Sequence, residues 1–236
     1  MRAATEQREL FALPGGLPTS LVYRPDFLSR AEEESLLAEI RALPLEEARY
    51  RSFTAKRRIA SFGAGYDFET NALLPAPPHP AFLRPLRDRV AALAKIPADE
   101  LAQCNVAEYR PGTQLGWHRD VPRFGIVVGV SLAAPARMRL RPYPHVKHAN
   151  ERALVLELEP RSAYVLRDEA RWRWQHAISP TKALRYSITF RTMARPRAAV
   201  RRARAGDNRC ALDANGAKRT GWPSTSASLP RSTRSA

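Results

Sequence analysis

The sequence predicts a mainly β protein of the α+β class, with a double-stranded β-helix (jelly roll) core, two supporting N-terminal helices and a disordered basic C-terminal tail. Three observations lead to this prediction. Helical periodicity occurs twice before residue 100, short alternating strands follow from Cys104, and the apolar pattern stops after Pro196. With 236 residues, 44% of them hydrophobic, the chain is long enough for one domain with a proper core.

Two amphipathic helices are expected in the N-terminal half. Ser29 and Glu32 form a capping box that starts the first helix, which Pro44 ends. Its apolar positions are Leu36, Leu37, Ile40 and Leu43. The second helix closes before Pro97, and its apolar positions are Phe82, Leu86, Val90 and Leu93.

Short strands account for most of the chain after residue 100. Apolar and polar residues alternate there in runs that Pro, Gly and Asp separate, which is typical of strands and turns. The predicted strands cover residues 104–109, 117–120, 125–132, 137–141, 152–158, 162–167, 173–178 and 184–192. Two helices followed by about eight strands favour a helical layer packed on a jelly roll of two sheets.

The chain divides into three parts in this prediction: a lead-in over residues 1–24, the folded domain over 25–195 and a tail over 196–236. Ser, Thr, Arg, Ala, Gly and Pro dominate the tail, which indicates disorder. The net charge is +16, and about half of it lies in the tail, so the folded domain is basic as well. This charge indicates a polyanionic partner, of which nucleic acid is the commonest. Solubility alone, or an arginine-rich codon bias, would explain the same composition.

Cysteine usage and the absence of long apolar runs suggest the compartment. Cys104 and Cys210 are the two cysteines, which argues against a disulfide framework or a cysteine zinc site and fits a reducing cytosol. No apolar run reaches the length of a signal peptide or a membrane span. We therefore expect a cytoplasmic, soluble monomer without membrane attachment.

The sequence Gly-Trp-His-Arg-Asp at residues 116–120 is the main candidate for chemistry. On an extended strand, His118 and Asp120 point to the same side. If His176 joined them from a distant strand, two imidazoles and one carboxylate would form the facial triad of a non-haem Fe(II) oxygenase. Taken singly, each histidine is more often a surface or hydrogen-bonded residue.

The last predicted strand supplies a second candidate feature. Arg185 and Arg191 are six residues apart, so both face the same side of the strand, with Ser187 and Thr189 between them. Two guanidinium groups directed into an apolar interior would be costly unless anions met them, and a dicarboxylate would satisfy both. The alternative is that this face lies in solvent.

The order of these motifs resembles the AlkB family of 2-oxoglutarate- and Fe(II)-dependent dioxygenases. The resemblance rests on Tyr-Arg-Pro-Gly at 109–112, then the His-x-Asp pair, the downstream histidine and the arginine strand. It implies His118, Asp120 and His176 as iron ligands, and Tyr109, Arg185, Ser187 and Arg191 as the 2-oxoglutarate site. It also implies O2 as co-substrate and oxidative dealkylation of N-alkylated nucleobases in DNA or RNA. Ser187 and Ala107 stand where asparagines are usual, and Pro122 stands where repair members often carry an acidic residue.

Residues 50–70 alternate loosely around aromatic residues and two glycines, so we expect hairpins or a flexible lid there rather than core strands. This segment resembles the family's nucleotide-recognition lid. The resemblance implies that Arg58 holds phosphates while an aromatic side chain stacks on an extruded base. The candidates for stacking are Phe62, Tyr66 and Phe68. Alternatively, these aromatics close the mouth of the jelly roll.

Two other functions stay open at this level. One is the same oxygenase chemistry on a protein or a small molecule, which Pro122 favours. The other is a non-catalytic jelly-roll module that binds nucleic acid through its basic face. A zinc hydrolase fits a paired-arginine strand poorly.

Overall fold

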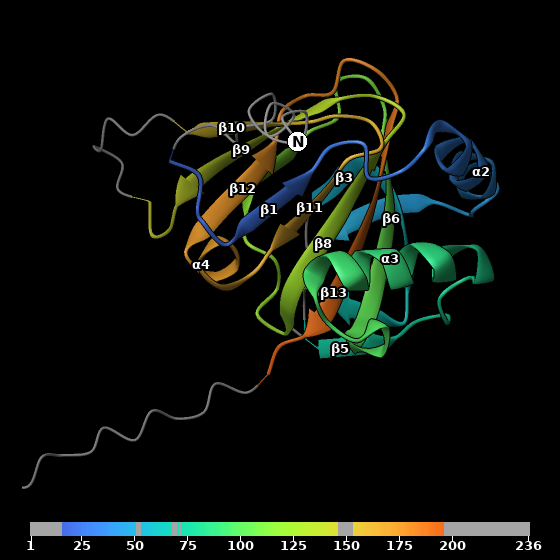
Figure 1. Ribbon diagram of the computed structural model, residues 1–236, viewed down its shortest axis with the longest axis horizontal. Helices are drawn as coiled ribbons and strands as arrows, with labels where there is room; N and C mark the ends of the chain where they lie inside the picture. The colour runs from blue at the N-terminus through green and yellow to red at the C-terminus, as the bar shows by residue number, and fades with distance from the viewer. Residues whose placement is uncertain (1–15, 51–52, 68–69, 71, 146–152, 196–236) are drawn as a thin grey trace, which may run out of the picture. The chain divides into compact units, whose positions relative to one another are not determined.

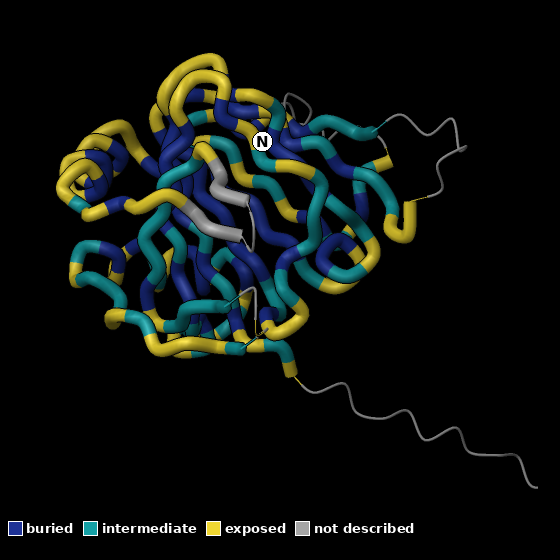
Figure 2. Tube along the Cα trace, turned by 180° about the vertical axis from the view of Figure 1, so that it is seen from behind, coloured by how far each residue is buried: buried dark blue, intermediate teal, exposed yellow. Residues whose placement is uncertain are grey.

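The computed structural model describes residues 16–50, 53–67, 70, 72–145 and 153–195. Its core consists of two antiparallel sheets, as Figure 1 shows. The predicted tail, most of the lead-in and Phe68 lie outside the described residues. Figure 2 shows buried residues concentrated in the strands and exposed residues in the turns between them.

Strands from distant parts of the chain lie side by side in each sheet. The larger sheet has the order β1 (Leu21–Arg24), β11 (Ala163–Leu166), β8 (Phe124–Leu132), β13 (Arg185–Met193), β6 (Leu101–Tyr109), β3 (Phe53–Phe62) and β2 (Glu46–Tyr50). The smaller has the order β10 (Leu154–Leu158), β9 (Ala136–Pro142), β12 (Trp174–Ile178) and β7 (Leu115–His118). The chain passes repeatedly between the sheets from β6 to β13, which confirms the predicted jelly roll.

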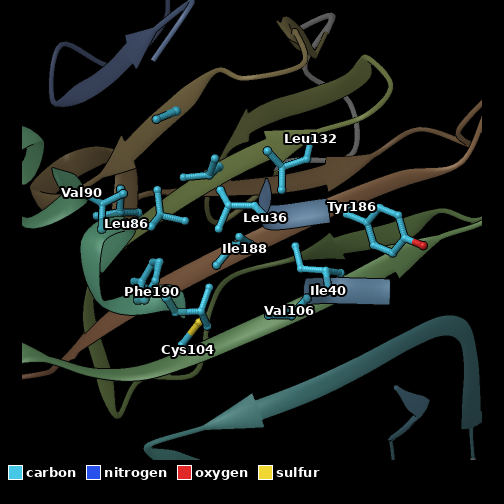
Figure 3. Packing of buried hydrophobic residues seen from close by; sticks show 14 of the residues in the cluster. Leu36, Ile40, Leu86, Val90, Cys104, Val106, Leu132, Tyr186, Ile188 and Phe190 are labelled. Carbon is cyan, nitrogen blue, oxygen red and sulfur yellow. The ribbon is translucent and has the colours of Figure 1, made fainter. Parts of the chain in front are cut away.

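Two helices cover the outer face of the larger sheet, as predicted. Helix α2 (Arg30–Arg41) begins at Ser29, whose side chain and that of Glu32 form the predicted capping box. Helix α3 (Arg84–Ala94) follows the short 3-10 turn Ala81–Leu83. Both helices pack their apolar side chains on β6 and β13 (Figure 3). The helix residues in this contact are Leu36, Ile40, Leu86 and Val90, and the strand residues are Cys104, Val106, Tyr186, Ile188 and Phe190.

The inner face of the larger sheet turns toward the smaller one. Tyr109, Val127 and Tyr164 from the larger sheet share a second apolar cluster with Met138 and Leu140 from β9. Position 129 on β8 requires a glycine. Its cross-strand partner is Tyr164, and a Cβ on Gly129 would lie 2.2 Å from the tyrosine ring.

Several elements differ from the sequence-based expectation, which also assigned no strand to β2 or to β5 (Ala72–Pro75). Residues 21–24, assigned to the lead-in, form the edge strand β1, which pairs with β11. Over residues 50–70, β3 forms a hairpin with β2, as expected, but it also pairs with β6 inside the larger sheet, so the expectation that no core strand lies there is wrong. The separate hairpin of β4 (Ala64–Asp67) and β5 agrees with the expectation of a hairpin near this segment. The five-residue helix α4 (Asp168–Trp172) was not predicted, since it is too short for a periodic signal.

Within the described part of the chain, no helix combines the length and the apolar character that crossing a membrane requires.

The outer core is the apolar cluster between the helices and the larger sheet, and shortening one of its side chains tests the packing of β13. Replacing the fully buried Ile188 with Val should lower the free energy of unfolding by about 0.5–1.5 kcal/mol, and with Ala by about 2–5 kcal/mol. Urea denaturation measures both values. Leu74→Ala is the control, because Leu74 is 49% exposed and should change stability by less than about 0.5 kcal/mol. Equal losses at the two positions would contradict the described core.

Candidate active site

A cavity of about 810 Å³ lies between the two sheets. Strand alternation decides which side chains reach it, because successive residues point to opposite faces. Four alternate residues of β13 line the cavity, namely Arg185, Ser187, Thr189 and Arg191. The residues between them, Tyr186, Ile188 and Phe190, pack against the helices. The cavity therefore has a polar wall on the same strand that forms the apolar core behind it.

His118, Asp120 and His176 converge in this cavity, as the sequence predicts. β7 ends at His118, and Asp120 follows two residues later. His176 on β12 is the cross-strand partner of His118, with 4.2 Å between the ring centres. One ligand atom from each of the three residues lies within 4.8 Å of the others. Such a set offers one carboxylate and two imidazoles to a single ion.

Both imidazoles are neutral at physiological pH. Burial lowers the pKa of His176 to about 3 and also lowers the pKa of His118. Nδ1 of His118 donates a hydrogen bond to the Gly116 carbonyl at 2.9 Å, so its Nε2 keeps a free lone pair. Neutral rings with a free nitrogen are the form in which histidine binds metals.

The Asp120 carboxylate is held on one side and open on the other. Its Oδ1 accepts a 2.7 Å hydrogen bond from Nε of Arg191. Its Oδ2 lies 3.6 Å from Nε2 of His176 and is buried without a hydrogen-bond partner. Burial, the largest single effect, would raise the pKa of Asp120, but Arg191 acts against it together with His176, His118 and Arg171, and the pKa is held well below its usual range. A buried anionic oxygen facing two neutral imidazoles fits a divalent cation of the Fe(II) class.

Arg171 on α4 fixes the loop that carries Asp120. Its guanidinium group is buried and donates to the carbonyl oxygens of Asp120, Val121, Phe124 and Gly125 at 2.8–3.0 Å. Sequence reasoning missed this residue. An arginine that binds main-chain carbonyls leaves no pattern in the sequence, because its partners are not side chains.

Arg185 forms the other end of the cavity. The side chain is 2% exposed, its Nε donates to Ser131 Oγ at 3.0 Å, and its guanidinium lies 4.9 Å from the centre of the Tyr109 ring. Its Nη1 is buried without a hydrogen-bond partner. A buried cationic donor without a partner is costly, so this end of the cavity fits a carboxylate.

The remaining residues predicted for the co-substrate lie nearby. Ser187 is buried in the cavity wall, and Arg191 also lines it. Arg191 donates through Nε to Asp120 and through Nη1 to Gln103 Oε1 at 2.8 Å, so its other N–H groups are the donors that a bound anion would use. The two arginines thus point into the cavity rather than into solvent.

Tyr109 and Arg57 complete this wall. Nη1 of Arg57 donates to the Tyr109 hydroxyl at 3.4 Å. Burial alone would raise the pKa of Tyr109, but the charges of Arg57 and Arg185 lower it below its ordinary value. A more acidic hydroxyl is a stronger hydrogen-bond donor to a carboxylate.

The residues predicted to bind a substrate base lie partly outside the cavity and partly in its wall. Phe62 is 8% exposed in the outer core, so its predicted stacking role is wrong. Arg58 is also misassigned, because it points away from the cavity and donates to the Leu45 carbonyl at 2.7 Å. Its neighbour Arg57 faces the cavity instead. Tyr66 on β4 does line the cavity, with its ring centre 6.5 Å from that of Phe124.

Comparison with known families agrees with this geometry. A family model described as the 2OG-Fe(II) oxygenase superfamily matches residues 20–191. The cofactors of that family are Fe(II) and 2-oxoglutarate, with O2 as the second co-substrate. The matched region contains each of the cavity residues described above.

Two curated relatives are named for the AlkB group. The chain is 34% identical to the Bos taurus protein "Alpha-ketoglutarate-dependent dioxygenase alkB homolog 7, mitochondrial", over 69% of this chain and 68% of that protein. It is 28% identical to the Arabidopsis thaliana "Alkylated DNA repair protein ALKBH8 homolog", over 65% of this chain and 49% of that protein. The matches thus span between about half and two thirds of the relatives' lengths.

Solved structures share the fold at low sequence identity. OsALKBH1 superposes with a TM-score of 0.59 at 16% identity, covering 75% of this chain and 98% of that one. A Pseudomonas putida prolyl-4-hydroxylase gives a TM-score of 0.52 at 17% identity, covering 75% and 94%. Together with the family match, these findings show that the chain belongs to the 2OG-Fe(II) oxygenase superfamily and is an AlkB-like member of it.

Proposed function

We propose that this protein is an Fe(II)- and 2-oxoglutarate-dependent dioxygenase that oxidatively dealkylates N-alkylated nucleobases in nucleic acid. One observation carries the oxygenase part of the proposal. The open Oδ2 of Asp120 and the unpartnered Nη1 of Arg185 face one cavity, together with His118 and His176. A divalent cation and a carboxylate would satisfy both groups at once.

The chain's own residues bind and orient in this mechanism. His118, Asp120 and His176 would hold Fe(II), while Arg185 and the Tyr109 hydroxyl would hold a carboxylate of 2-oxoglutarate. When bound, Fe(II) supplies oxidation of a substrate C–H bond, coupled to decarboxylation of 2-oxoglutarate and reduction of O2. Arg191 helps to fix the Asp120 carboxylate in its anionic form.

Nucleic acid is proposed as the substrate because of the protein's net charge and because of the residues that line the cavity. The net charge of +16 supports a polyanionic partner. Lys56, Arg57 and Arg119 line the same cavity as Tyr66. Cations for phosphate groups thus lie beside an aromatic ring on which an extruded base can stack. The name of the Arabidopsis relative agrees with an alkylated nucleic acid as substrate.

Pro122 favours a second candidate, which is the same chemistry on a protein or a small molecule. This residue is exposed in the loop after Asp120 and offers no hydrogen-bonding side chain to a base. Product analysis separates the two candidates.

Substitutions at the two ends of the cavity should separate metal binding from co-substrate binding. Asp120→Ala should abolish Fe(II) binding, because it removes the anionic ligand. Arg185→Gln should keep Fe(II) binding and weaken 2-oxoglutarate by at least about 30-fold, since one buried charge pair is lost. Anaerobic calorimetry measures both affinities. His145→Ala, at an exposed histidine, should change neither. Tight Fe(II) binding by Asp120→Ala would contradict the assignment.

Arg171→Lys tests the support of the Asp120 loop. A single ammonium group cannot reproduce the guanidinium's contacts with four carbonyls, so Fe(II) affinity should fall by about 10- to 100-fold. Anaerobic Fe(II) titration measures the affinity, and thermal unfolding confirms that the variant is folded. Arg173→Lys, at an exposed neighbour, is the matched control. An unchanged Fe(II) affinity in folded Arg171→Lys would show that the loop keeps its position without the guanidinium.

Mass spectrometry of methylated DNA and RNA oligonucleotides tests the substrate assignment. Incubation with Fe(II), 2-oxoglutarate and O2 should restore the unmodified base and yield one succinate for each methyl group removed. Succinate formed without loss of the methyl group would favour the protein or small-molecule substrate. Absence of both products would contradict nucleic acid as the substrate.

A further inference from the structure

Three arginines and two aromatic residues form a continuous surface on the outer side of the smaller sheet. We call it the arginine–tryptophan surface, and its residues are Trp117, Arg119, Arg139, Arg141 and Tyr143. On β9, Met138 and Leu140 point into the core, so alternation directs Arg139 and Arg141 outward.

Aromatic rings hold these guanidinium groups in place. The Trp117 ring centre lies 4.2 Å from Cζ of Arg141 and 5.0 Å from Cζ of Arg139. Ala177 of β12 is the cross-strand partner of Arg139, and its small side chain leaves room for the indole of β7 to reach β9. Beside this stack, Cζ of Arg119 lies 3.6 Å from the centre of the Tyr143 ring. Stacking of this kind orients a guanidinium but leaves its N–H donors for another partner.

The charges on this surface are not neutralised within the described residues. Arg141 donates to the Gln175 side chain at 2.9 Å and Arg119 to the Trp172 carbonyl at 3.1 Å, both uncharged acceptors. Nε of Arg139 is buried without a hydrogen-bond partner. The next outward residue of the same strand, Arg137, differs because it pairs with Glu157 at 2.6 Å. Ion pairing therefore occurs on this face, but the three stacked arginines form no ion pair with a described residue.

The surface continues into the cavity described above. Trp117 and Arg119 both line that cavity and flank the metal-site residue His118. From β7 across β12 to β9 the sheet spans two inter-strand spacings, about 10 Å. This width is enough for about two successive phosphates of one strand.

We propose that the arginine–tryptophan surface binds the phosphodiester backbone of the nucleic-acid strand whose base enters the cavity. This inference rests on the proposed nucleic-acid substrate and names the residues that hold the strand. Oriented guanidinium groups bind phosphate oxygens bidentately, and the rings reduce the conformational entropy that binding costs. Mutual repulsion among the stacked cations falls when phosphates lie between them.

The test is salt-dependent binding of a labelled, unmodified single-stranded oligonucleotide of about 12 nucleotides, measured by fluorescence anisotropy. The double variant Arg139→Gln/Arg141→Gln should bind about tenfold or more weakly. The slope of log K against log salt should fall by about 1.4, because each lost phosphate contact removes about 0.7. Thermal unfolding of the variant should match that of the unaltered protein.

The matched control is Arg137→Gln/Arg84→Gln, which also removes two positive charges, at an ion-paired position of β9 and an exposed position of α3. It should weaken binding by less than about threefold, because it removes long-range attraction only. Equal losses in both variants, or no loss in the first, would overturn the proposal. So would tight binding to phosphatidylglycerol vesicles, dependent on Arg139 and Arg141, without oligonucleotide binding.

The two proposals fail in different ways. If the oligonucleotide binds through Arg139 and Arg141 but its methylated form is not repaired, the surface stands and the dealkylation function fails. If methylated bases are repaired equally well by the first double variant, the function stands and this surface is excluded.

Discussion

The buried ion pair between Arg191 and Asp120 is the interaction on which the site depends. It joins the last strand of the larger sheet to the loop that follows β7 of the smaller sheet, through a 2.7 Å hydrogen bond. The same contact keeps the carboxylate anionic and turns its free Oδ2 toward His176. Burial by itself favours the protonated acid, which is a poor metal ligand, and Arg191 is the first among the charged groups that oppose this effect. Arg171 then holds the main chain of that loop through four carbonyls, so the carboxylate is fixed from both sides.

The jelly roll allows one strand to serve the core and the site together. On β13, Tyr186, Ile188 and Phe190 pack under the helices, while Arg185 and Arg191 reach the cavity on the other face. A shift of register by one residue would exchange the two sets and place charge in the core. The packing of the outer core therefore fixes the arginines, and stability and chemistry are coupled through the pleat of this strand.

The sequence alone predicted the two helices and most strands, because capping boxes and alternation are local patterns. The triad was predicted through the order of the motifs along the chain, which resembles that of the AlkB family. It failed where the answer depends on tertiary pairing. Whether β3 joins the larger sheet depends on β6, and the same pairing decides that Arg57 faces the cavity and Arg58 does not. Phe62 was misassigned for the same reason, since the sequence pattern of an aromatic residue near glycines is the same in a lid and in a core. Arg171 could not be found, because carbonyl oxygens have no signature in a sequence.

A crystal structure grown anaerobically with Fe(II) and 2-oxoglutarate tests the central claim most directly. We expect one anomalous iron peak bound by Nε2 of His118, Nε2 of His176 and Oδ2 of Asp120, with a co-substrate carboxylate on Nη1 of Arg185. An iron peak away from these three residues, or a co-substrate that leaves Arg185 without an anion, would contradict it.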